Sequence, residues 1–385
     1  MNVALYHPWI YLKGGIERTL VELTARSRHR WSIFTSHHDP DGTFAELRER
    51  HIVELDRVAV DRDMVSVARA AARIARTRLP AGDHDAVVVC CDGLGSLLNF
   101  GLPAVPVACL CFTPLRAVYD PEYRDRQQPR SGARRIAWAL AERAYRLVDR
   151  RAWRRYDHVF CISDTVRRRV VAGGLHPGDD IELAHPGIDA SAIHPSRAHE
   201  PFFFLPGRIM WTKNIELGVQ AFLRLWPAAP APMRLVIAGM VDGKSAPYLS
   251  RIQSMVEGRD DVSFVIDPGD AEMADLYERC HATLFTAFNE DWGLTPLEAM
   301  RHGKPVIAVA RGGPTEVVLD GRTGFLAEPD TAAFAAAMRR VVDDPALAQA
   351  MGTAGLERAR MFTWQRFVHV IDDGLERMVT RRPAD

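Results

Sequence analysis

The chain has 385 residues, of which 47% are hydrophobic and 25% charged, and its formal net charge at pH 7 is zero. This composition predicts an ordinary globular protein of two or three domains and excludes the fibrous, disordered and disulfide-rich classes. The balanced charge gives no indication of a nucleic-acid partner. Because no apolar stretch approaches the 18 residues of a membrane span and no charged leader precedes the first apolar run, we expect a cytoplasmic protein.

Short apolar runs alternate with amphipathic segments in the first half of the chain. The apolar runs have the length and residue types of buried strands, and the amphipathic segments have helical spacing. Strands are expected at residues 2–6, 31–35, 86–91, 105–111 and 158–162, and helices at 16–26 and 65–78.

The same alternation begins again after Pro195. Here the expected strands are residues 202–206, 234–238, 262–266, 282–286 and 306–310, and the expected helices are 215–225, 271–279 and 331–342. Regular alternation of strands and helices indicates a parallel sheet covered on both faces, and two such sets predict two doubly wound Rossmann-like α/β domains facing across a cleft.

Proline and small residues concentrate at 185–195, which is the expected linker. The predicted domains are therefore 1–190 and 196–363. A last segment with helical spacing, 364–385, is expected to cross back onto the first domain; the alternative is a final helix of the second domain.

A glycine pair, Gly14-Gly15, follows the first expected strand and opens a helix. Glycine permits close approach of a phosphate or sugar to the backbone at a helix N-terminus. The full G-x-G-x-x-G spacing is missing, so a dinucleotide cofactor is not expected. A second pair, Gly312-Gly313, follows the expected strand at 306–310.

The six cysteines lie in or beside apolar runs and lack the C-x-x-C spacing of metal sites, so they are expected to be buried free thiols.

Residues 124–155 are rich in arginine and contain an apolar stripe at helical spacing. The stripe consists of Ile136, Leu140, Ala144, Leu147 and Val148. The ordinary interpretation is a helix whose apolar stripe faces the core and whose basic face is solvated. The alternative is a peripheral membrane contact, because basic amphipathic helices bind anionic lipid.

Arg208 and Lys213 stand in a glycine-containing loop directly after the expected strand 202–206. At the carboxyl end of a parallel strand two cations can clamp a diphosphate, the arginine through its planar fork and the lysine as a point charge. They would take the place of a metal ion. The structural alternative is a pair of solvated loop cations.

Residues 281–308 are the most informative stretch of the chain. A buried strand is followed by a polar loop, by a short helix that opens at Thr295 and stops at Gly303, and by a second strand. This crossover points a helix N-terminus at the carboxyl edge of the sheet, where it favours an anion. Glu290 and Glu298 can accept hydrogen bonds from hydroxyls, so the combination predicts a sugar-nucleotide site.

A structural role is open for each of these two carboxylates. Glu298 stands three residues after Thr295, the spacing of a capping box with Pro296 at the first helical position. Glu290 could be a solvated loop residue.

Metal-dependent sugar transfer is the competing chemistry, because Asp39-Pro-Asp41 and Asp61-Arg-Asp63 have D-x-D spacing and paired carboxylates suit Mg²⁺ or Mn²⁺. Such short motifs occur by chance. No metal ion and no other cofactor is therefore expected.

Taken in order, these motifs resemble glycosyltransferase family 4, whose members are retaining enzymes of GT-B fold. The likeness extends through Gly14-Gly15, 186–189, Gly207-Arg208 with Lys213, 290–298 and the helix at Trp364. The segment from Glu290 to Glu298 is most similar to bacterial mannosyltransferases of surface glycan assembly.

The resemblance implies a role for each matching residue. Arg208 and Lys213 would hold the donor diphosphate, Glu290 the transferred sugar and Glu298 the ribose hydroxyls. The remaining contacts would come from the backbones of Gly293, Leu294 and Thr295 and from Gly15 in the first domain.

The chain departs from the family at Phe112, where similar proteins often carry a sugar-facing histidine. Phenylalanine cannot donate or accept a hydrogen bond, so another group must take over any such role. Arg116 and Asp120 follow and could line the acceptor side, although a loop ion pair fits equally well.

The resemblance predicts transfer of a hexose, with retention, from a nucleotide-diphosphate sugar to a hydroxyl on a glycan, a glycolipid or a small metabolite. GDP-mannose is slightly favoured over UDP-sugars as the donor. The expected acceptors include lipid-linked ones. The alternatives are a sugar-nucleotide epimerase of the same architecture and a sugar-nucleotide-binding pseudoenzyme.

Overall fold

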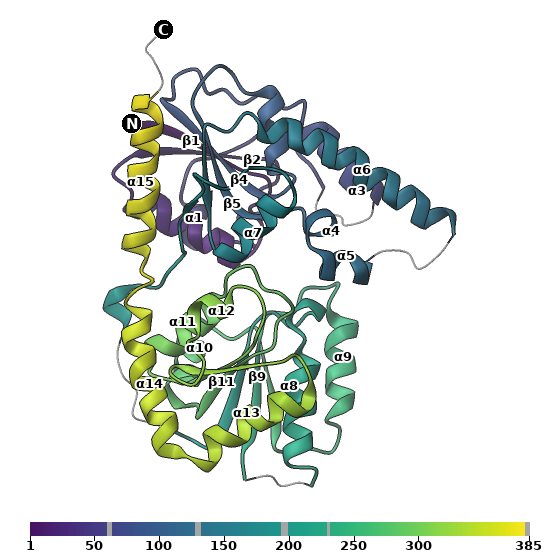
Figure 1. Ribbon diagram of the computed structural model, residues 1–385, viewed down its shortest axis with the longest axis vertical. Coiled ribbons are helices and arrows are strands. Elements are labelled where there is room, and N and C mark those ends of the chain that lie inside the picture. Colours follow the sequence, from purple (N-terminus) through teal and green to yellow (C-terminus); the bar gives the residue numbers. More distant parts are fainter. Residues whose placement is uncertain (60–63, 128–131, 194–198, 229–231, 382–385) are drawn as a thin grey trace. The chain divides into compact units, whose positions relative to one another are not determined.

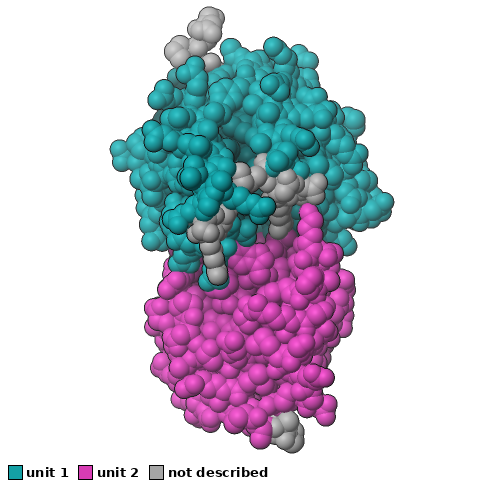
Figure 2. Space-filling model, turned by 90° about the vertical axis from the view of Figure 1, so that its right-hand side faces the viewer, with its two compact units in different colours: residues 1–186, 364–385 teal, residues 187–363 magenta. Residues whose placement is uncertain are grey.

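The structure is a computed structural model that describes residues 1–59, 64–127, 132–193, 199–228 and 232–381. The chain divides into two compact units, coloured separately in Figure 2. Unit 1 comprises residues 1–186 and 364–385, and unit 2 comprises residues 187–363. The division after Pro186 falls four residues before the end of the expected first domain.

Unit 1 is built on a seven-stranded sheet whose strands are all parallel, in the order β3-β2-β1-β4-β5-β6-β7. Four of these strands, β1, β2, β4 and β5, are labelled in Figure 1. The strands are β1 (Asn2–His7), β2 (Arg30–Thr35), β3 (Ile52–Glu54), β4 (Ala86–Gly93), β5 (Val107–Pro114), β6 (His158–Cys161) and β7 (Glu182–Leu183). The strand order reverses direction between β1 and β4, so this sheet has its topological switch point there.

The helices of unit 1 connect successive strands of this sheet, as in other doubly wound folds. They are α1 (Gly15–Arg26), α2 (Ala45–Arg48), α3 (Met64–Ile74), η1 (Gly95–Gly101), α4 (Arg116–Tyr119), α5 (Pro121–Gln127), α6 (Ala133–Trp153), α7 (Asp164–Ala172) and α15 (Trp364–Arg381).

Unit 2 contains a six-stranded parallel sheet in the order β10-β9-β8-β11-β12-β13. The strands are β8 (Phe202–Pro206), β9 (Arg234–Gly239), β10 (Val262–Ile266), β11 (Ala282–Phe285), β12 (Val306–Val309) and β13 (Gly324–Ala327). Its order reverses between β8 and β11. Side chains of the sheet pack with those of the surrounding helices in one hydrophobic core, which includes Phe203, Phe222 and Phe334.

The helical elements of unit 2 are η2 (Ala190–Ala192), η3 (Trp211–Lys213), α8 (Ile215–Leu225), α9 (Ala246–Met255), α10 (Asp270–Arg279), α11 (Leu294–Arg301), α12 (Pro314–Val317), α13 (Thr331–Asp343) and α14 (Pro345–Ala359). The prediction of two doubly wound α/β sheets is confirmed in both units.

The final helix, α15, packs against α1 and β6 of unit 1 and is the yellow helix beside α1 in Figure 1. The buried carboxylate of Asp372 accepts hydrogen bonds from the Ser27 hydroxyl at 2.6 Å and from the Arg28 backbone N–H at 3.0 Å. Close packing also depends on Gly374, where a Cβ atom would stand 2.4 Å from the ring of Phe160. Residues 364–381 are therefore held by unit 1 and not by the unit that precedes them in sequence.

The orientation of α6 differs from the ordinary interpretation of its sequence. Ile136, Leu140 and Leu147 are 64–65% exposed, so the apolar stripe faces solvent and not the core. The buried face instead carries Asp149 and Trp153, each 1% exposed. This expectation was wrong because helical spacing identifies a stripe but not the direction in which the helix turns it.

The buried carboxyl of Asp149 is accommodated by its neighbours. It accepts a hydrogen bond from the Ser96 hydroxyl of η1 at 2.5 Å. Burial, together with the nearby Cys91, raises its pKa to about 7. A polar anchor therefore fixes α6 to η1 on the inner side of the helix.

Within the described residues, no helix combines the length and the apolar character needed to cross a membrane.

Candidate functional site

The switch point of unit 2 brings together two loops that are far apart in sequence. β8 and β11 are neighbouring strands, and the loops that leave their carboxyl ends carry Lys213 and Glu290. In open parallel sheets the crevice outside the carboxyl ends at a switch point is the usual ligand site. Most of the residues predicted for the donor lie at this edge.

The loop after β8 needs glycine at two positions. Gly207 has φ +136°, a conformation that side chains disfavour. At Gly239, which ends β9, a Cβ atom would lie 2.0 Å from the carbonyl oxygen of Gly207. The tight packing of these two strand ends fixes the start of the loop, in which Arg208 is half-buried.

Lys213 is anchored through its backbone and its side chain. The Thr286 hydroxyl at the end of β11 donates to the carbonyl oxygen of Lys213 at 2.8 Å. The ammonium group lies 5.8 Å from the centroid of the Phe285 ring and donates to Glu290 Oε2 at 2.9 Å. The side chains of Lys213 and Glu290 are 21% and 27% exposed, so this ion pair is partly accessible.

This ion pair joins two residues for which the sequence indicated separate roles, Lys213 for the diphosphate and Glu290 for the sugar. Glu290 is therefore not a freely solvated loop residue. A lysine ammonium has three donors, so the contact with Glu290 leaves donors for an anion at the same edge.

The Glu290 loop rests on the second glycine pair. Gly313 donates its backbone N–H to the carbonyl oxygen of Glu290 at 2.7 Å. A Cβ atom at Gly312 would stand 2.3 Å from that oxygen, and one at Gly313 would stand 2.1 Å from the Trp292 carbonyl oxygen. The pair is thus needed for close packing beneath the loop, and the helix that follows it, α12, has only four residues.

Helix α11 begins at Leu294, one residue before the expected start. Gly293 is its N-cap, with φ +123° and no side-chain capping bond, and Pro296 is the third helical residue. The capping box between Thr295 and Glu298 is therefore not formed. The sequence signal that was missed is Gly293, because glycine readily adopts a positive φ at an N-cap and threonine does not.

Glu298 has a different partner, a buried tyrosine on α10. The Tyr277 hydroxyl donates to Glu298 Oε2 at 2.9 Å. The Tyr277 ring stacks on His302 at 5.7 Å and meets the ring of Phe204 edge-on at 4.9 Å. One carboxylate oxygen is thereby fixed, which orients the half-buried Glu298 side chain for contacts through the other.

A small open pocket of about 220 Å³ lies at the same switch point. Its lining comes from the ends of β8 and β11 and from the loops that follow them, and includes Gly207, Lys213, Phe285 and Thr286. Because this volume includes space open to solvent, the enclosed part is small, and the pocket suits at most one group of a larger ligand.

Gly15 of unit 1 occupies the position expected from its sequence context. It is the first residue of α1 and is exposed, with Gly14 as the N-cap. A Cβ atom at Gly14 would meet Leu12 at 2.5 Å and the carboxylate of the buried Glu17 at 2.7 Å. The glycines thus allow the backbone to turn tightly from the loop after β1 into the helix.

Phe112 is buried on β5, and its ring meets the imidazole of His7 edge-on at 6.4 Å. His7 ends β1, is 2% exposed, and its Nδ1 atom has no hydrogen-bond partner among the described residues. Burial lowers the pKa of His7 to about 3. The imidazole beside the Phe112 position therefore comes from another strand, a proximity that only the pairing of the strands reveals.

Arg116 and Asp120 form an ion pair at 2.8 Å, the structural alternative named above. Asp120 is fully buried and also contacts Arg169 of α7 at 3.3 Å. Burial alone would raise the pKa of Asp120, but the two guanidinium groups hold it below its usual value. Arg169 in turn donates to the Thr113 hydroxyl at 2.7 Å, so Asp120 positions the end of β5 and its carboxylate is not open to an acceptor.

Arg169 was not anticipated from the sequence, where it is one of three consecutive arginines. It is 7% exposed and lies on the inner face of α7 with Val166 and Val170. Its spacing of three residues from the buried Val166 is the signal that could have identified it.

The two D-x-D sequences do not form a carboxylate pair in the described part of the chain. Asp39 Oδ1 accepts from the backbone N–H groups of Asp41 and Gly42 in a turn, and Asp41 is 89% exposed at its side chain. Asp61 and Asp63 lie outside the described residues.

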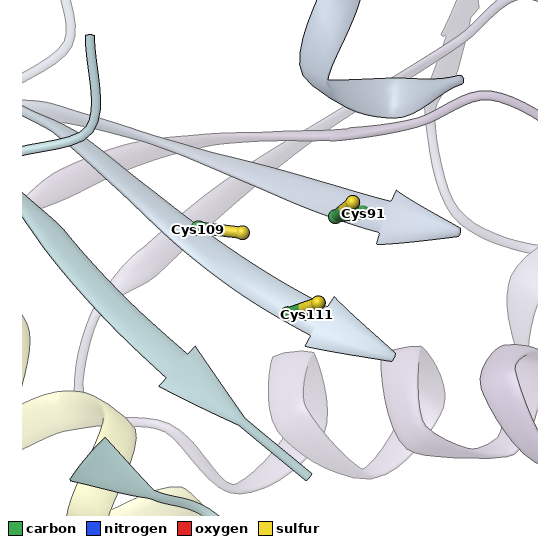
Figure 3. A group of neighbouring side chains, drawn as sticks. All are labelled: Cys91, Cys109 and Cys111. Atoms are coloured by element: carbon green, nitrogen blue, oxygen red, sulfur yellow. The ribbon is translucent and has the colours of Figure 1, made fainter. Parts of the chain in front are cut away.

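All six cysteines are buried and free, as expected. Three of them, Cys91, Cys109 and Cys111, form a cluster on neighbouring strands of unit 1 (Figure 3). Hydrogen bonds from Cys109 and Cys111 lower the pKa of Cys91 to about 5, against the effect of burial.

The structure thus gathers Arg208, Lys213, Glu290, Gly293, Leu294, Thr295 and Glu298 in unit 2, on loops and helices at the carboxyl edge of its sheet. Gly15, Arg116 and Asp120 belong to unit 1 and lie beyond the carboxyl ends of β1 and β5.

Most of unit 2 is recognisable in known proteins. Residues 189–358 match the family described as glycosyl transferases group 1. A D-inositol 3-phosphate glycosyltransferase of Streptomyces avermitilis is 31% identical over 202 residues, which is 49% of this chain and 43% of that protein. The mouse alpha-1,3/1,6-mannosyltransferase ALG2 is 33% identical over 192 residues, 47% of this chain and 45% of that protein. The match thus spans about half the length of these curated relatives.

Solved structures resemble the chain over almost its whole length. A sucrose-phosphate synthase from Thermosynechococcus elongatus covers 99% of the chain and all of its own, with TM-score 0.76 and 19% identity. A glycosyltransferase from Rickettsia africae covers 99% of both chains, with TM-score 0.73 and 15% identity. These similarities show that the chain has the GT-B fold of two Rossmann-like units.

Proposed function

We propose that the chain is a retaining glycosyltransferase that moves a hexose from a nucleotide-diphosphate sugar to a hydroxyl acceptor. The observation that carries this proposal is the juxtaposition of Lys213 and Glu290 at the switch point of a unit that matches the glycosyl transferases group 1 family. A cation for phosphate and a carboxylate for hydroxyls at one strand edge suit a sugar nucleotide.

Lys213 and Arg208 act on the leaving group in this mechanism. As the bond between the anomeric carbon and the diphosphate oxygen breaks, negative charge grows on the phosphate, where fixed cations stabilise it more than in the ground state. The acceptor hydroxyl attacks from the same face and passes its proton to the departing phosphate oxygen. Neither a side-chain base nor a metal ion is required by this sequence of events.

The remaining residues hold the donor. Glu298, with one oxygen fixed by Tyr277, accepts hydrogen bonds from the ribose hydroxyls through the other. The N-terminus of α11 at Gly293, Leu294 and Thr295 offers backbone N–H groups to the sugar and phosphate. Gly15 contributes the same kind of contact from α1. A cytoplasmic location of the protein is consistent with such a donor.

Mannose is the favoured sugar, supplied as GDP-mannose, because a relative named a mannosyltransferase is 33% identical over 47% of the chain. UDP-sugars are the second choice. The acceptor is a hydroxyl of a glycan, a glycolipid or a small metabolite. A relative named a D-inositol 3-phosphate glycosyltransferase supports the last of these classes.

A thermal-shift screen with UDP, GDP, ADP and TDP tests the donor. A ligand that binds only the folded state stabilises it by about 2.7 kcal/mol at one hundred times its Kd. GDP is expected to give the largest shift. The matching sugar nucleotide is then offered as a substrate. Transfer or hydrolysis of this donor identifies a glycosyltransferase, and its epimerisation identifies an epimerase. Binding of the donor without any reaction identifies a pseudoenzyme.

Lys213→Ala tests the catalytic assignment. We expect turnover to fall at least about a hundredfold, which is typical for loss of one group that stabilises transition-state charge. Lys244→Ala, an exposed lysine of the same unit, is the control and should leave turnover unchanged. Normal turnover of Lys213→Ala would refute the assignment, and loss of turnover in a chelator would restore the metal-dependent alternative.

Peripheral contact with an anionic membrane is the second proposal, and it is supported by the exposed face of α6. Ile136, Leu140 and Leu147 are exposed, and Arg143 and Arg151 follow the last two at spacings of three and four residues. Spacing of three or four places these side chains on one face of the helix. Apolar side chains flanked by arginines bind anionic bilayers, which would bring the site to lipid-linked acceptors.

Sedimentation with liposomes tests this contact. The protein is expected to sediment with vesicles that contain anionic lipid, and Leu140→Ser combined with Leu147→Ser should return it to the supernatant. Val171→Ser, a substitution of a 41% exposed valine on α7, is the control. Equal recovery in the supernatant with neutral and anionic vesicles would end the proposal.

A further inference from the structure

The cysteine cluster lies on one face of the unit 1 sheet and contains none of the residues assigned to the donor. Cys91 is the register partner of Cys111 on the neighbouring strand, and Cys109 lies two residues before Cys111. Residues paired across strands and residues two apart share a face of the sheet. Cys90 therefore points to the opposite face, although it is adjacent to Cys91 in sequence.

The three sulfur atoms are close enough to share one ion. The Sγ atoms of Cys91, Cys109 and Cys111 all lie within 4.8 Å of one another, and the residues are at most 1% exposed (Figure 3). Sulfurs bound to one zinc ion lie about 3.8–4.0 Å apart, because each Zn–S bond is about 2.3 Å. Small side-chain rotations would bring the cluster to this geometry.

A fourth thiol and a polar group border the cluster. Cys161 is the register partner of Cys111 on β6, so it shares the same face. The Tyr156 hydroxyl is buried without a hydrogen-bond partner among the described residues and interacts electrostatically with Cys109 and Cys91. A buried unpaired hydroxyl is unfavourable, and sulfurs that carry negative charge would give this O–H an acceptor.

We propose that Cys91, Cys109 and Cys111 form a buried structural site for a soft, thiophilic metal ion, Cu⁺ or Zn²⁺. Thiolates select these ions over Mg²⁺ and Ca²⁺. Each coordinating thiol gives up its proton to solvent when its sulfur binds the ion. Cu⁺ requires the three clustered sulfurs, whereas structural Zn²⁺ is almost always four-coordinate and takes Cys161 as its fourth ligand.

The site would fasten the ends of two central strands of unit 1. Cys91 is near the carboxyl end of β4, and its thiol lies 3.8 Å from the carbonyl oxygen of Thr113 on β5. Thr113 is the residue that Arg169 and Asp120 position, so the ion would stabilise the segment that leads into α4. Because the cluster is buried, the ion would enter during folding, as metal sites that form with the fold do.

Metal content of the intact chain tests the site. The chain is refolded from denaturant without oxygen, in a phosphine reductant, with Zn²⁺ or with Cu⁺, and the metal per chain is measured by elemental analysis after gel filtration. We expect about one ion per chain. Cys91→Ala and Cys109→Ala should lower metal affinity at least tenfold, the loss that follows even from removing an outer-shell partner.

Two further variants serve as control and discriminator. Cys90→Ala removes an equally buried thiol from the opposite face and should retain the ion. Cys161→Ala should release Zn²⁺ and retain Cu⁺. The proposal is overturned if the wild type holds no more of either ion than Cys91→Ala, or if Cys90→Ala loses as much metal as Cys91→Ala.

A measurement on the unaltered chain guards against variants that fail to fold. Metal-loaded and metal-free chains are denatured partially and alkylated, and slow-reacting cysteines are identified by mass spectrometry. Bound metal should protect Cys91, Cys109 and Cys111 and raise the melting temperature. Equal alkylation of all six cysteines with and without metal would overturn the proposal.

Discussion

Lys213 and Glu290 form an ion pair at 2.9 Å, so in the proposed donor site the diphosphate competes with the Glu290 carboxylate for the Lys213 ammonium group. This competition affects the binding of a nucleoside diphosphate and the turnover of a sugar donor in different ways. The carboxylate weakens the hold of Lys213 on a nucleoside diphosphate that lacks a sugar. When the sugar is present, its hydroxyls give Glu290 a replacement for the lysine.

Glu290→Gln should therefore change affinity and turnover in opposite directions. Because removing the carboxylate charge frees Lys213, we expect a nucleoside diphosphate to bind several times more tightly. A tenfold gain in affinity would correspond to about 1.4 kcal/mol. Turnover of the sugar donor should fall, because the contact with the sugar is weakened. Calorimetric titration and donor turnover measure the two effects, and weaker binding of the nucleoside diphosphate would contradict the competition.

His7 gives the stability of unit 1 a dependence on pH. Its imidazole has a pKa of about 3 in the folded chain because of burial, against a usual value of 6.5. Below pH 6.5 the unfolded chain binds a proton that the folded chain does not, so stability falls as the pH decreases. The slope approaches 1.36 kcal/mol per pH unit well below pH 6.5, and the total loss is about 2 kcal/mol between pH 7 and 5.

His7→Gln should remove this part of the pH dependence. We expect the free energy of unfolding of the wild type to decline relative to that of the variant as the pH falls from 7 to 5. Denaturant unfolding at several pH values measures the difference. Parallel curves for the two proteins would show that His7 does not remain neutral in the folded state.

Among the helices, α15 has the clearest structural dependence on one side chain. The buried Asp372 caps the end of α1 by accepting bonds from Ser27 and Arg28. The side chain of the neighbouring Asp373 is 36% exposed and pairs with the guanidinium group of Arg28 at 2.7 Å and with His369 at 3.2 Å. Similar residues on one helix thus offer a matched comparison.

Asp372→Ala should destabilise the chain by about 1–3 kcal/mol, because buried donors lose a charged acceptor. Asp373→Ala should have little effect, since exposed ion pairs contribute little to stability. Denaturant unfolding of both variants measures the contrast. If the two variants unfold alike, α15 does not depend on this buried contact.

Periodicity identified the central strands of both sheets and one edge strand, β10, and missed the other edge strands, β3, β7 and β13. The ends of β8 and β10 were predicted without error because both are mostly apolar runs that stop at a turn residue, Gly207 or Asp267. β3 and β7 have only three and two residues and are half-exposed, so they leave no apolar run to detect. β13 begins with Gly324, where a side chain would collide with the Val306 backbone, and glycine lowers the apparent strand signal.

The candidate site was predictable in its location but not in its contacts. The types of residue in the loops after β8 and β11 indicated an anion and hydroxyls, because parallel strands end at one edge. The Lys213–Glu290 pair, the Tyr277–Glu298 bond and the cysteine cluster all depend on which strands are neighbours. Strand order is a property of the folded sheet, and sequence spacing does not reveal it.

At the scale of the whole chain, the proposed donor-binding residues lie almost entirely in unit 2. Every residue proposed to hold the diphosphate and the ribose, except Gly15, lies between residues 187 and 363, and this unit has its own sheet and hydrophobic core. Donor recognition should therefore survive without unit 1, whereas transfer is expected to need acceptor contacts from unit 1.

We predict that a fragment of residues 187–363 folds and binds the preferred nucleoside diphosphate within roughly tenfold of the affinity of the full chain, a difference of at most about 1.4 kcal/mol. It should show no transfer. Circular dichroism establishes that the fragment is folded, and calorimetric titration measures its affinity. Lys213→Ala should weaken binding by a similar factor in the fragment and in the full chain. A folded fragment that binds no nucleotide would place the main donor contacts in unit 1, because nothing else distinguishes the two proteins.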